Sequence, residues 1–260
     1  MKRLTRLVAT LAALALVLAA CGSDSGSSGS DLNLVKDGTL TVCTDAPYKP
    51  MEFEDSSAEG GYTGFDIELM RAIADDLGLS LEVNNTGFDP ITSGLAMEGG
   101  SCDVAAASIT ITEEREQNID FSDPYFTADQ SLLAADGSGL TDLAGSGGMS
   151  IAVQTGTTGE QYAQDNAPSD TELVSFENPG DMFLALEAGN VVGVLQDIVP
   201  NAEYALDHDA SIVENYPTNE EYGFAVKETG AEDILDAVNT ELAKLKDNGT
   251  YDNIYADWFK

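Results

Sequence analysis

Arginine is scarce in this sequence of 260 residues, which has 11 basic and 46 acidic side chains, so each arginine is informative. Arg71 falls in the middle of an expected helix and fits a solvated or ion-paired surface position. Arg115 instead follows an expected strand end and a threonine-rich turn. A planar guanidinium group can bind a carboxylate through two parallel hydrogen bonds. Arg115 is therefore a candidate anion site, and the alternative is a structural salt bridge with Glu113, Glu114 or Glu116.

Two further positions have the chemistry of a small-molecule site. Thr158 follows Gly156 and Thr157 at the expected start of a helix, where free backbone N–H groups and the helix dipole favour an anion. A plain helix cap by either threonine is the alternative, and capping is compatible with binding. Asp197 ends an expected strand, and open α/β sheets bind ligands at the carboxyl ends of their strands.

The charge balance and the reactive side chains exclude several classes of protein. A formal net charge of −35 argues against nucleic-acid binding, because phosphates need a basic surface. One histidine, His208, and three scattered cysteines give no metal cluster of known spacing. The sequence has neither a glycine-rich phosphate loop with lysine nor a nucleophile-elbow motif. We therefore expect no catalytic triad, no metal and no other cofactor.

The first 31 residues have the pattern of an exported, lipid-anchored protein. Residues 1–20 combine basic positions with a stretch rich in Leu and Ala, as a secretory signal peptide does. The small residues before Cys21 resemble the bacterial lipoprotein box, in which the cysteine carries a diacylglycerol. An uncleaved membrane span is the alternative, but the apolar stretch is short for the roughly 20 residues that a span needs. Residues 21–31, rich in Gly and Ser, fit a flexible tether.

The rest of the sequence alternates strand and helix patterns with short glycine-containing connections, which is typical of an α/β fold. Asp66 is placed to cap one helix, Thr110 with Glu113 resembles a capping box, and Asn178 with Pro179 begins another helix. The expected strands are 40–44, 79–83, 103–108, 131–135, 150–153, 191–195 and 222–226, and the clearest expected helices are 66–77, 88–98, 231–246 and 251–259.

Cys43 and Cys102 are the two cysteines beyond the tether, and an oxidising compartment would permit a disulfide between them. Cys43 lies near the end of an expected strand, whereas Cys102 lies at the start of another. If these strands are parallel neighbours, the two residues would be too far apart for a bridge. The sequence leaves this pairing open.

Short motifs follow one another in a fixed order along the chain: Thr44-Asp45-Ala46-Pro47-Tyr48, Gly64-Phe65-Asp66-Ile67, Ser108-Ile109-Thr110-Ile111-Thr112-Glu113-Glu114-Arg115, Phe121-Ser122-Asp123-Pro124-Tyr125, Gln154-Thr155-Gly156-Thr157-Thr158, Gln196-Asp197 and Asp247-Asn248-Gly249-Thr250-Tyr251. Together they resemble the polar amino-acid-binding proteins of ATP-driven bacterial uptake systems. This resemblance covers 40–259 and implies a two-lobed α/β fold of the type II periplasmic-binding-protein kind. Lobe 1 would comprise 32–127 and 222–260 and lobe 2 would comprise 128–221, with two crossovers between them and the ligand in the interlobe cleft.

The resemblance also implies how the backbone end of an amino acid would be bound. Arg115 would bind the α-carboxylate, with help from Thr110 of the same lobe and Thr158 of the other lobe. Asp197 would bind the α-ammonium group, with the Ser108 carbonyl as a second acceptor. A zwitterion would thus be held by both lobes.

Five more side chains would surround the side chain of the ligand. Tyr48 and Phe88 resemble an aromatic pair that encloses it, although core packing is the usual place for such rings. Asp45 matches a position that contacts side-chain nitrogen in relatives, with Gln154 and Gln196 as neutral partners. A carboxylate there favours an amide or a cation and disfavours glutamate and aspartate. Glutamine and the basic amino acids both fit, and the sequence does not choose between them.

Other functions on the same fold remain open. A few relatives are dehydratases of carboxylated rings, which need a general acid or base, and Glu52 and Asp45 are the nearest candidates. The Arg115 and Asp197 pair favours amino-acid binding instead, and a ligand sensor for a receptor is a further alternative. For the transport function we expect a monomer, anchored by lipid to the outer face of the cell membrane, with a membrane permease of an ABC transporter as partner.

Overall fold

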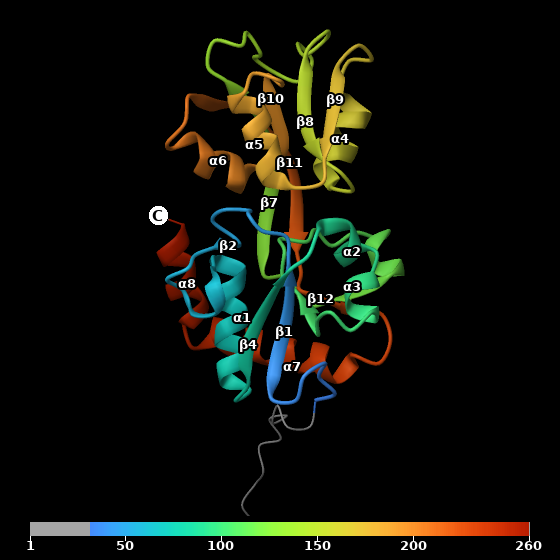
Figure 1. Cartoon of the computed structure of the whole chain (residues 1–260), viewed down its shortest axis with the longest axis vertical. Coiled ribbons are helices and arrows are strands. Elements are labelled where there is room, and N and C mark those ends of the chain that lie inside the picture. Colours follow the sequence, from blue (N-terminus) through green and yellow to red (C-terminus); the bar gives the residue numbers. More distant parts are fainter. Residues whose placement is uncertain (1–31, 260) are drawn as a thin grey trace, which may run out of the picture.

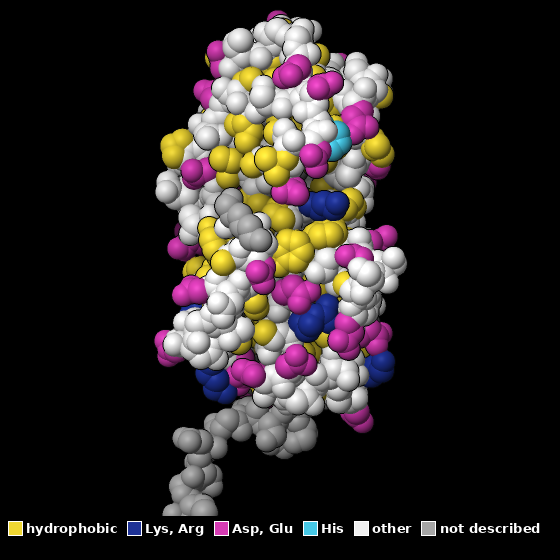
Figure 2. Space-filling view, turned by 90° about the vertical axis from the view of Figure 1, so that its left-hand side faces the viewer, with side chains coloured by type: hydrophobic (Ala, Val, Ile, Leu, Met, Phe, Trp, Pro, Cys, Tyr) yellow, Lys and Arg dark blue, Asp and Glu magenta, His cyan; other side chains and the backbone are white. Residues whose placement is uncertain are grey.

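The computed structural model describes residues 32–259, which form two lobes joined by strands that run from one to the other (Figure 1). Each lobe contains one five-stranded sheet with helices packed against it. The predicted two-lobed α/β fold is therefore confirmed. On the face drawn in Figure 2, acidic side chains are spread over both lobes. No helix within 32–259 combines the length and the apolar character needed to cross a bilayer.

Lobe 1 is built on the sheet with strand order β4-β1-β5-β12-β6. The interior strand β1 is buried along its whole length, because separate apolar clusters cover its two faces. β1 runs parallel to β4 and β5, and β12 runs antiparallel to β5 and β6. The elements of this lobe are β1 (Thr39–Thr44), β2 (Phe53–Glu54), β3 (Tyr62–Thr63), α1 (Phe65–Asp76), β4 (Ser80–Asn85), α2 (Phe88–Thr92), α3 (Leu95–Glu98), β5 (Val104–Ala105), β6 (Ile119–Phe121), β12 (Ala225–Lys227), α7 (Glu232–Asp247) and α8 (Thr250–Trp258), with short 3-10 turns at Glu59–Gly61 and Arg115–Gln117.

Lobe 2 is built on the sheet with strand order β11-β7-β10-β8-β9. β8 runs parallel to β9 and β10, so their carboxyl ends meet at one edge of the sheet, the edge that faces lobe 1. Its elements are β7 (Phe126–Ala135), β8 (Ser150–Gln154), α4 (Thr158–Asn166), β9 (Glu172–Phe176), α5 (Pro179–Glu187), β10 (Gly193–Asp197), α6 (Ile198–Ala205) and β11 (Ala210–Tyr222).

The two crossovers are β7 and β11, which pair with each other as an antiparallel ribbon from one lobe to the other (Figure 1). The pairing extends from Phe126 with Tyr222 to Ala135 with Ala210. The ladder is interrupted between Tyr216 and Glu220, where four steps along β11 correspond to two along β7. This bulge lies in the part of the ribbon nearest lobe 1.

Several local predictions are wrong because tertiary contacts outweigh local patterns. Asp66 does not cap α1; its buried carboxylate accepts hydrogen bonds from the backbone N–H of Ser108 and the hydroxyl of Tyr125. Thr110 forms no capping box, because its hydroxyl donates to Glu220. The expected helix 88–98 is divided into α2 and α3 at Gly94, where φ is 78° and a Cβ would lie 2.7 Å from the carbonyl oxygen of Asn118. The predicted cap of α5 by Asn178, with Pro179 first in the helix, is confirmed.

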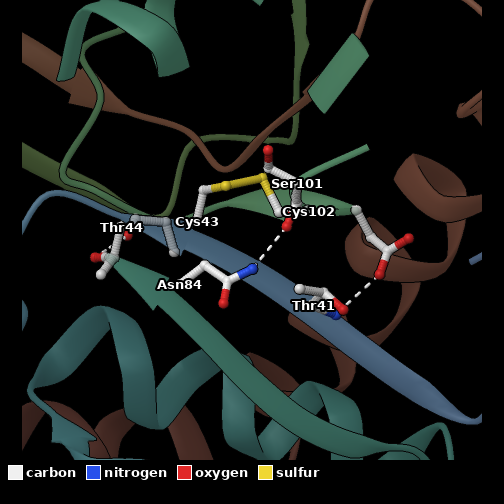
Figure 3. The surroundings of a disulfide bond; sticks show 8 residues. Thr41, Cys43, Thr44, Asn84, Ser101 and Cys102 are labelled. Atoms are coloured by element: carbon white, nitrogen blue, oxygen red, sulfur yellow. Dashed lines mark hydrogen bonds between the residues drawn. A yellow bond between two sulfur atoms is a disulfide. The ribbon is translucent and has the colours of Figure 1, made fainter. Parts of the chain in front are cut away.

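Cys43 and Cys102 form a disulfide that joins two parts of lobe 1 (Figure 3). Their Cα atoms are 5.6 Å apart, although β1 and β5 are parallel neighbours in the sheet. Cys43 pairs in register with Ala105, and Cys102 lies before β5, outside the ladder. Asn84, on β4, donates a hydrogen bond to the carbonyl of Ser101 and so fixes the backbone next to Cys102. The objection that parallel strands would separate the two cysteines is wrong, because it assumed a straight strand through Cys102.

Candidate interlobe binding site

A cavity lies between the lobes and has an empty volume, including its opening to solvent, of about 410 Å³. The structure brings all ten predicted ligand-binding residues to its wall, six from lobe 1 and four from lobe 2. The wall consists of Asp45, Tyr48, Glu52, Phe88, Ala107, Ser108, Thr110, Arg115, Gln154, Thr157, Thr158, Gly159, Gln196 and Asp197.

Arg115 is held in place by carbonyl oxygens from both lobes. Its Nη1 donates to the Thr110 carbonyl at 2.7 Å and its Nη2 donates to the Gly156 carbonyl at 3.1 Å. The guanidinium carbon lies 5.0 Å from the centre of the Phe88 ring. Within the described chain Arg115 makes no salt bridge, so the alternative of a local pair with a neighbouring glutamate does not apply. Burial lowers the pKa of Arg115, and the charges of Asp197 and Glu220 oppose this change.

Thr157 and Thr158 divide the two functions expected at the start of α4. Thr157 is the N-cap, since its hydroxyl accepts a hydrogen bond from the backbone N–H of Glu160 at 3.1 Å. Thr158 is the first residue of the helix, and its hydroxyl donates to Glu220 at 2.6 Å. Gly159 allows α4 to approach the sheet closely, because a Cβ there would lie 2.8 Å from Oε1 of Gln130. The hydroxyl of Thr158 is therefore directed to an acidic group rather than to capping.

Asp197 accepts hydrogen bonds from three side chains at the end of β10. The hydroxyl of Tyr48, from lobe 1, donates to it at 2.8 Å, and the hydroxyl of Tyr222 donates at 2.5 Å. Nε2 of Gln130 is the third donor. Burial raises the pKa of Asp197 to about 6, with a further contribution from the charge of Glu220, while these donors oppose the rise. The site thus contains a buried acceptor suited to an ammonium group.

Ser108 has a left-handed backbone conformation, with φ of 50°, which is uncommon for a residue with a side chain. Two buried acids hold it there: its N–H donates to Asp66 at 2.9 Å, and its hydroxyl donates to Glu52 at 3.2 Å. Its carbonyl accepts no hydrogen bond from any residue in 32–259. That carbonyl is consequently free to act as a second acceptor.

Asp45 and Gln154 meet across the cavity. Nε2 of Gln154, from lobe 2, donates to Oδ2 of Asp45 at 2.6 Å. Burial raises the pKa of Asp45 to about 7, against the lowering effect of this hydrogen bond. Gln196 instead donates to Asn201 at 2.9 Å, and its Oε1 is buried without a partner in the described chain. Asp45 and Gln154 therefore form one polar contact across the cavity, and Gln196 adds a second amide to its wall.

Four polar residues of this region were not among the predicted binding residues. Glu52 was named only as a possible general acid or base; it is buried, and burial raises its pKa well above the usual range, helped by the charges of Asp66 and Asp45. Gln130, Glu220 and Tyr222 were missed. The polar pair Gln130-Ser131 in the middle of an apolar strand could have indicated Gln130 from the sequence. The position of Glu220 could not be predicted, because it depends on the bulge in β11.

Comparison with known proteins places these features in a family. The family model described as bacterial extracellular solute-binding proteins, family 3, matches residues 40–260. A glutamine-binding protein of an ABC transporter in Bacillus subtilis (strain 168) is 32% identical over 259 residues, which is 94% of this chain and 93% of that protein.

Solved structures agree in fold and in type of protein. An ancestral amino-acid-binding protein, described as a precursor of cyclohexadienyl dehydratase, is 37% identical with a TM-score of 0.78, covering 86% of this chain and 96% of its own. An ancestral arginine-binding protein bound to glutamine is 36% identical with a TM-score of 0.78, covering 86% of this chain and 99% of its own.

Proposed function

Because the chain belongs to the bacterial extracellular solute-binding proteins of family 3, we propose that it captures a polar L-amino acid outside the cytoplasm and delivers it to the membrane permease of an ATP-driven uptake system. The observation that carries this proposal is the pairing of opposite charges in one buried cavity. Arg115 and Asp197 both line that cavity, and Asp197 accepts hydrogen bonds from Tyr48, Tyr222 and Gln130. A zwitterion has the matching charges.

The α-carboxylate of the ligand would bind Arg115 and the hydroxyls of Thr110 and Thr158. The three remaining N–H donors of the guanidinium group can bind a carboxylate, and the start of α4 favours a negative charge. The α-ammonium group would bind Asp197 and the carbonyl of Ser108. Since these groups come from both lobes, the bound amino acid would hold the lobes together.

The side chain of the ligand would lie between Tyr48 and Phe88 and extend toward Asp45. The carboxyl group of Asp45, which faces Gln154, suits a terminal amide or a cation and repels an acidic side chain. Glutamine and the basic amino acids both meet this requirement. The name of the glutamine-binding relative and the glutamine in the ancestral arginine-binding protein are consistent with either ligand.

Each lobe of the proposed arrangement contains one of the two five-stranded sheets. Lobe 1 comprises 32–127 and 222–260 and lobe 2 comprises 128–221, and the protein acts as a monomer that opens and closes about β7 and β11. Residues 1–20 act as the export signal, Cys21 carries the lipid, and 21–31 form the tether; all of these lie outside the described residues. The protein would then work at the outer face of the cell membrane.

The experiment is thermal unfolding of the purified protein with each of the twenty amino acids in turn. A ligand that binds only the folded state raises the midpoint, by an amount set by its concentration relative to its dissociation constant. We expect a rise with glutamine, arginine, lysine or histidine, and none in an Arg115→Ala variant. Arg71→Ala is the matched control, because Arg71 pairs with Glu68 on the surface of α1, remote from the cavity wall. If no amino acid shifts the midpoint, the proposal fails.

A second candidate function is catalysis at Glu52. Its buried carboxyl group lines the cavity beside the hydroxyl of Ser108 and is poised to hold a proton. We propose that the protein nevertheless returns its ligand unchanged, since the zwitterion site is intact. Mass spectrometry of amino acids and carboxylated ring compounds after incubation with the protein decides between these functions; loss of water from any of them, abolished in Glu52→Gln, would establish an enzyme.

A further inference from the structure

The bulge in β11 places Glu220 behind the wall of the interlobe cavity, in contact with the wall residues Thr110 and Thr158. It pairs with Ala128, whereas Tyr216 pairs with Gln130, so the chain between them contains two residues more than its partner strand. Side chains stabilise this bulge: Oδ1 of Asp129 accepts from the N–H of Asn219 at 2.9 Å, where Asn219 has a positive φ of 52°. A regular ladder would give Glu220 a different position relative to the cavity.

The carboxylate of Glu220 joins groups from the two lobes. Oε2 accepts from the hydroxyl of Thr110, in lobe 1, at 2.8 Å and from the hydroxyl of Thr158, in lobe 2, at 2.6 Å. Oε1 accepts from Nε2 of Gln130 at 3.1 Å, and the same amide group donates to Asp197. One acidic side chain from a crossover strand therefore bridges the lobes beside Arg115.

These are the same two hydroxyls that the proposed function assigns to the α-carboxylate of the ligand. A threonine hydroxyl has one proton to donate, so Thr110 and Thr158 cannot each donate to Glu220 and to a ligand carboxylate at once. Two carboxylates side by side in a shielded cavity also repel each other. The bound ligand and the present position of Glu220 are mutually exclusive.

Resting on the proposed function, we propose that Glu220 competes with the ligand: its carboxylate occupies the Thr110 and Thr158 hydroxyls that the α-carboxylate would use, holds the lobes together without ligand, and must move away before an amino acid can bind. Part of the ligand's binding free energy is then spent in displacing it. Glu220 would thus set the affinity of the site although it does not contact the bound ligand.

The test measures ligand affinity and lobe closure in the purified protein carrying Glu220→Gln or Glu220→Ala. Glu221→Gln is the control, because it makes the same charge change one residue further along the crossover, at an exposed side chain. By calorimetry with the amino acid found for the wild type, both Glu220 variants should bind roughly five- to fifty-fold more tightly, a typical range for coupling between sites. By small-angle X-ray scattering without ligand, Glu220→Ala should have a larger radius of gyration than the wild type.

The outcomes test the role of Glu220 separately from amino-acid binding itself. Unchanged or weaker binding in both Glu220 variants would overturn it, and weaker binding would mean that Glu220 holds the ligand. If Glu220→Ala has the same radius of gyration as the wild type, Glu220 does not hold the lobes closed. If the wild type binds no amino acid, the proposed function fails, while the scattering measurement still tests the bridge between the lobes.

Discussion

The two lobes bring different kinds of group to the cavity. Lobe 1 contains a network whose members all belong to that lobe: Glu52, Asp66, Ser108 and Tyr125 are linked by buried hydrogen bonds. In lobe 2, several polar groups have their partners across the cleft, as Gln154 does with Asp45. We infer that lobe 1 is the preorganised side of the site, whereas lobe 2 completes its contacts only when the lobes meet.

The lobes differ in charge as well. Every Lys and Arg within 32–259 lies in the lobe 1 segments, and the stretch 128–221 contains none. Lobe 2 therefore has acidic side chains without a Lys or Arg of its own to offset them, which leaves its charges to be screened by salt or paired from outside. We infer that lobe 1 is the more rigid of the two lobes and that it also contains the cations that offset acidic side chains.

The largest expected effect tests the rigidity of lobe 1. Replacing both cysteines, as Cys43→Ala with Cys102→Ala, should lower the free energy of unfolding by about 4 kcal/mol, the chain-entropy value for a loop of the 59-residue separation. Urea unfolding measures this loss. Treating the wild type with a reductant should cause a similar loss and should leave the double variant unchanged; equal stability of all forms would contradict a preorganised lobe 1.

A smaller effect tests the contact between Asp45 and lobe 2. A basic ligand favours the ionised form of Asp45, whose pKa is about 7 in the folded protein. Below that pH the carboxyl group must release a proton on binding, so affinity for arginine should fall about tenfold from pH 8 to pH 6. Calorimetric titration across this range measures the change. In Asp45→Asn the fall should shrink to about twofold, the part due to Asp197 with its pKa of about 6; an unaltered tenfold fall would show that another group is responsible.

The smallest effect tests the difference in charge. Asp165→Lys places a cation near the end of α4 in lobe 2, and Asp75→Lys places one near the end of α1 in lobe 1; both side chains are exposed. Because lobe 2 has no cation of its own, the change there should stabilise the protein by about 0.5 kcal/mol more. Chemical unfolding at low and high salt measures both variants, and equal gains would show that the charge difference has no energetic consequence.

The sequence predicts the fold well because the strand and helix patterns are regular and the motifs of the resemblance follow the family order. All ten predicted binding residues line the cavity for the same reason. Predictions from local patterns alone were less successful. Asp66 has the position of a helix cap, but its partners, Ser108 and Tyr125, are 42 and 59 residues away in the chain.

The remaining features depend on three-dimensional details that a linear pattern does not contain. The position of Glu220 follows from two additional residues in one strand of a ladder, which alternation of polar and apolar residues does not reveal. The pairing of Cys43 with Cys102 depends on where the chain leaves the ladder before β5. In both cases the deviation from a regular strand determines which side chains meet.

The crossovers have a consequence for how the protein can signal that it is loaded. β7 and β11 form one hydrogen-bonded ribbon, so both connections lie together along one line between the lobes. A hinge rotation about an axis that crosses this ribbon displaces nearby atoms little and displaces atoms at the opposite rim of the cleft most. A partner that touches only the ribbon would meet nearly the same surface in the empty and loaded protein. A partner can therefore distinguish the loaded form from the empty form only by contacting both lobes at the rims that lie opposite the ribbon.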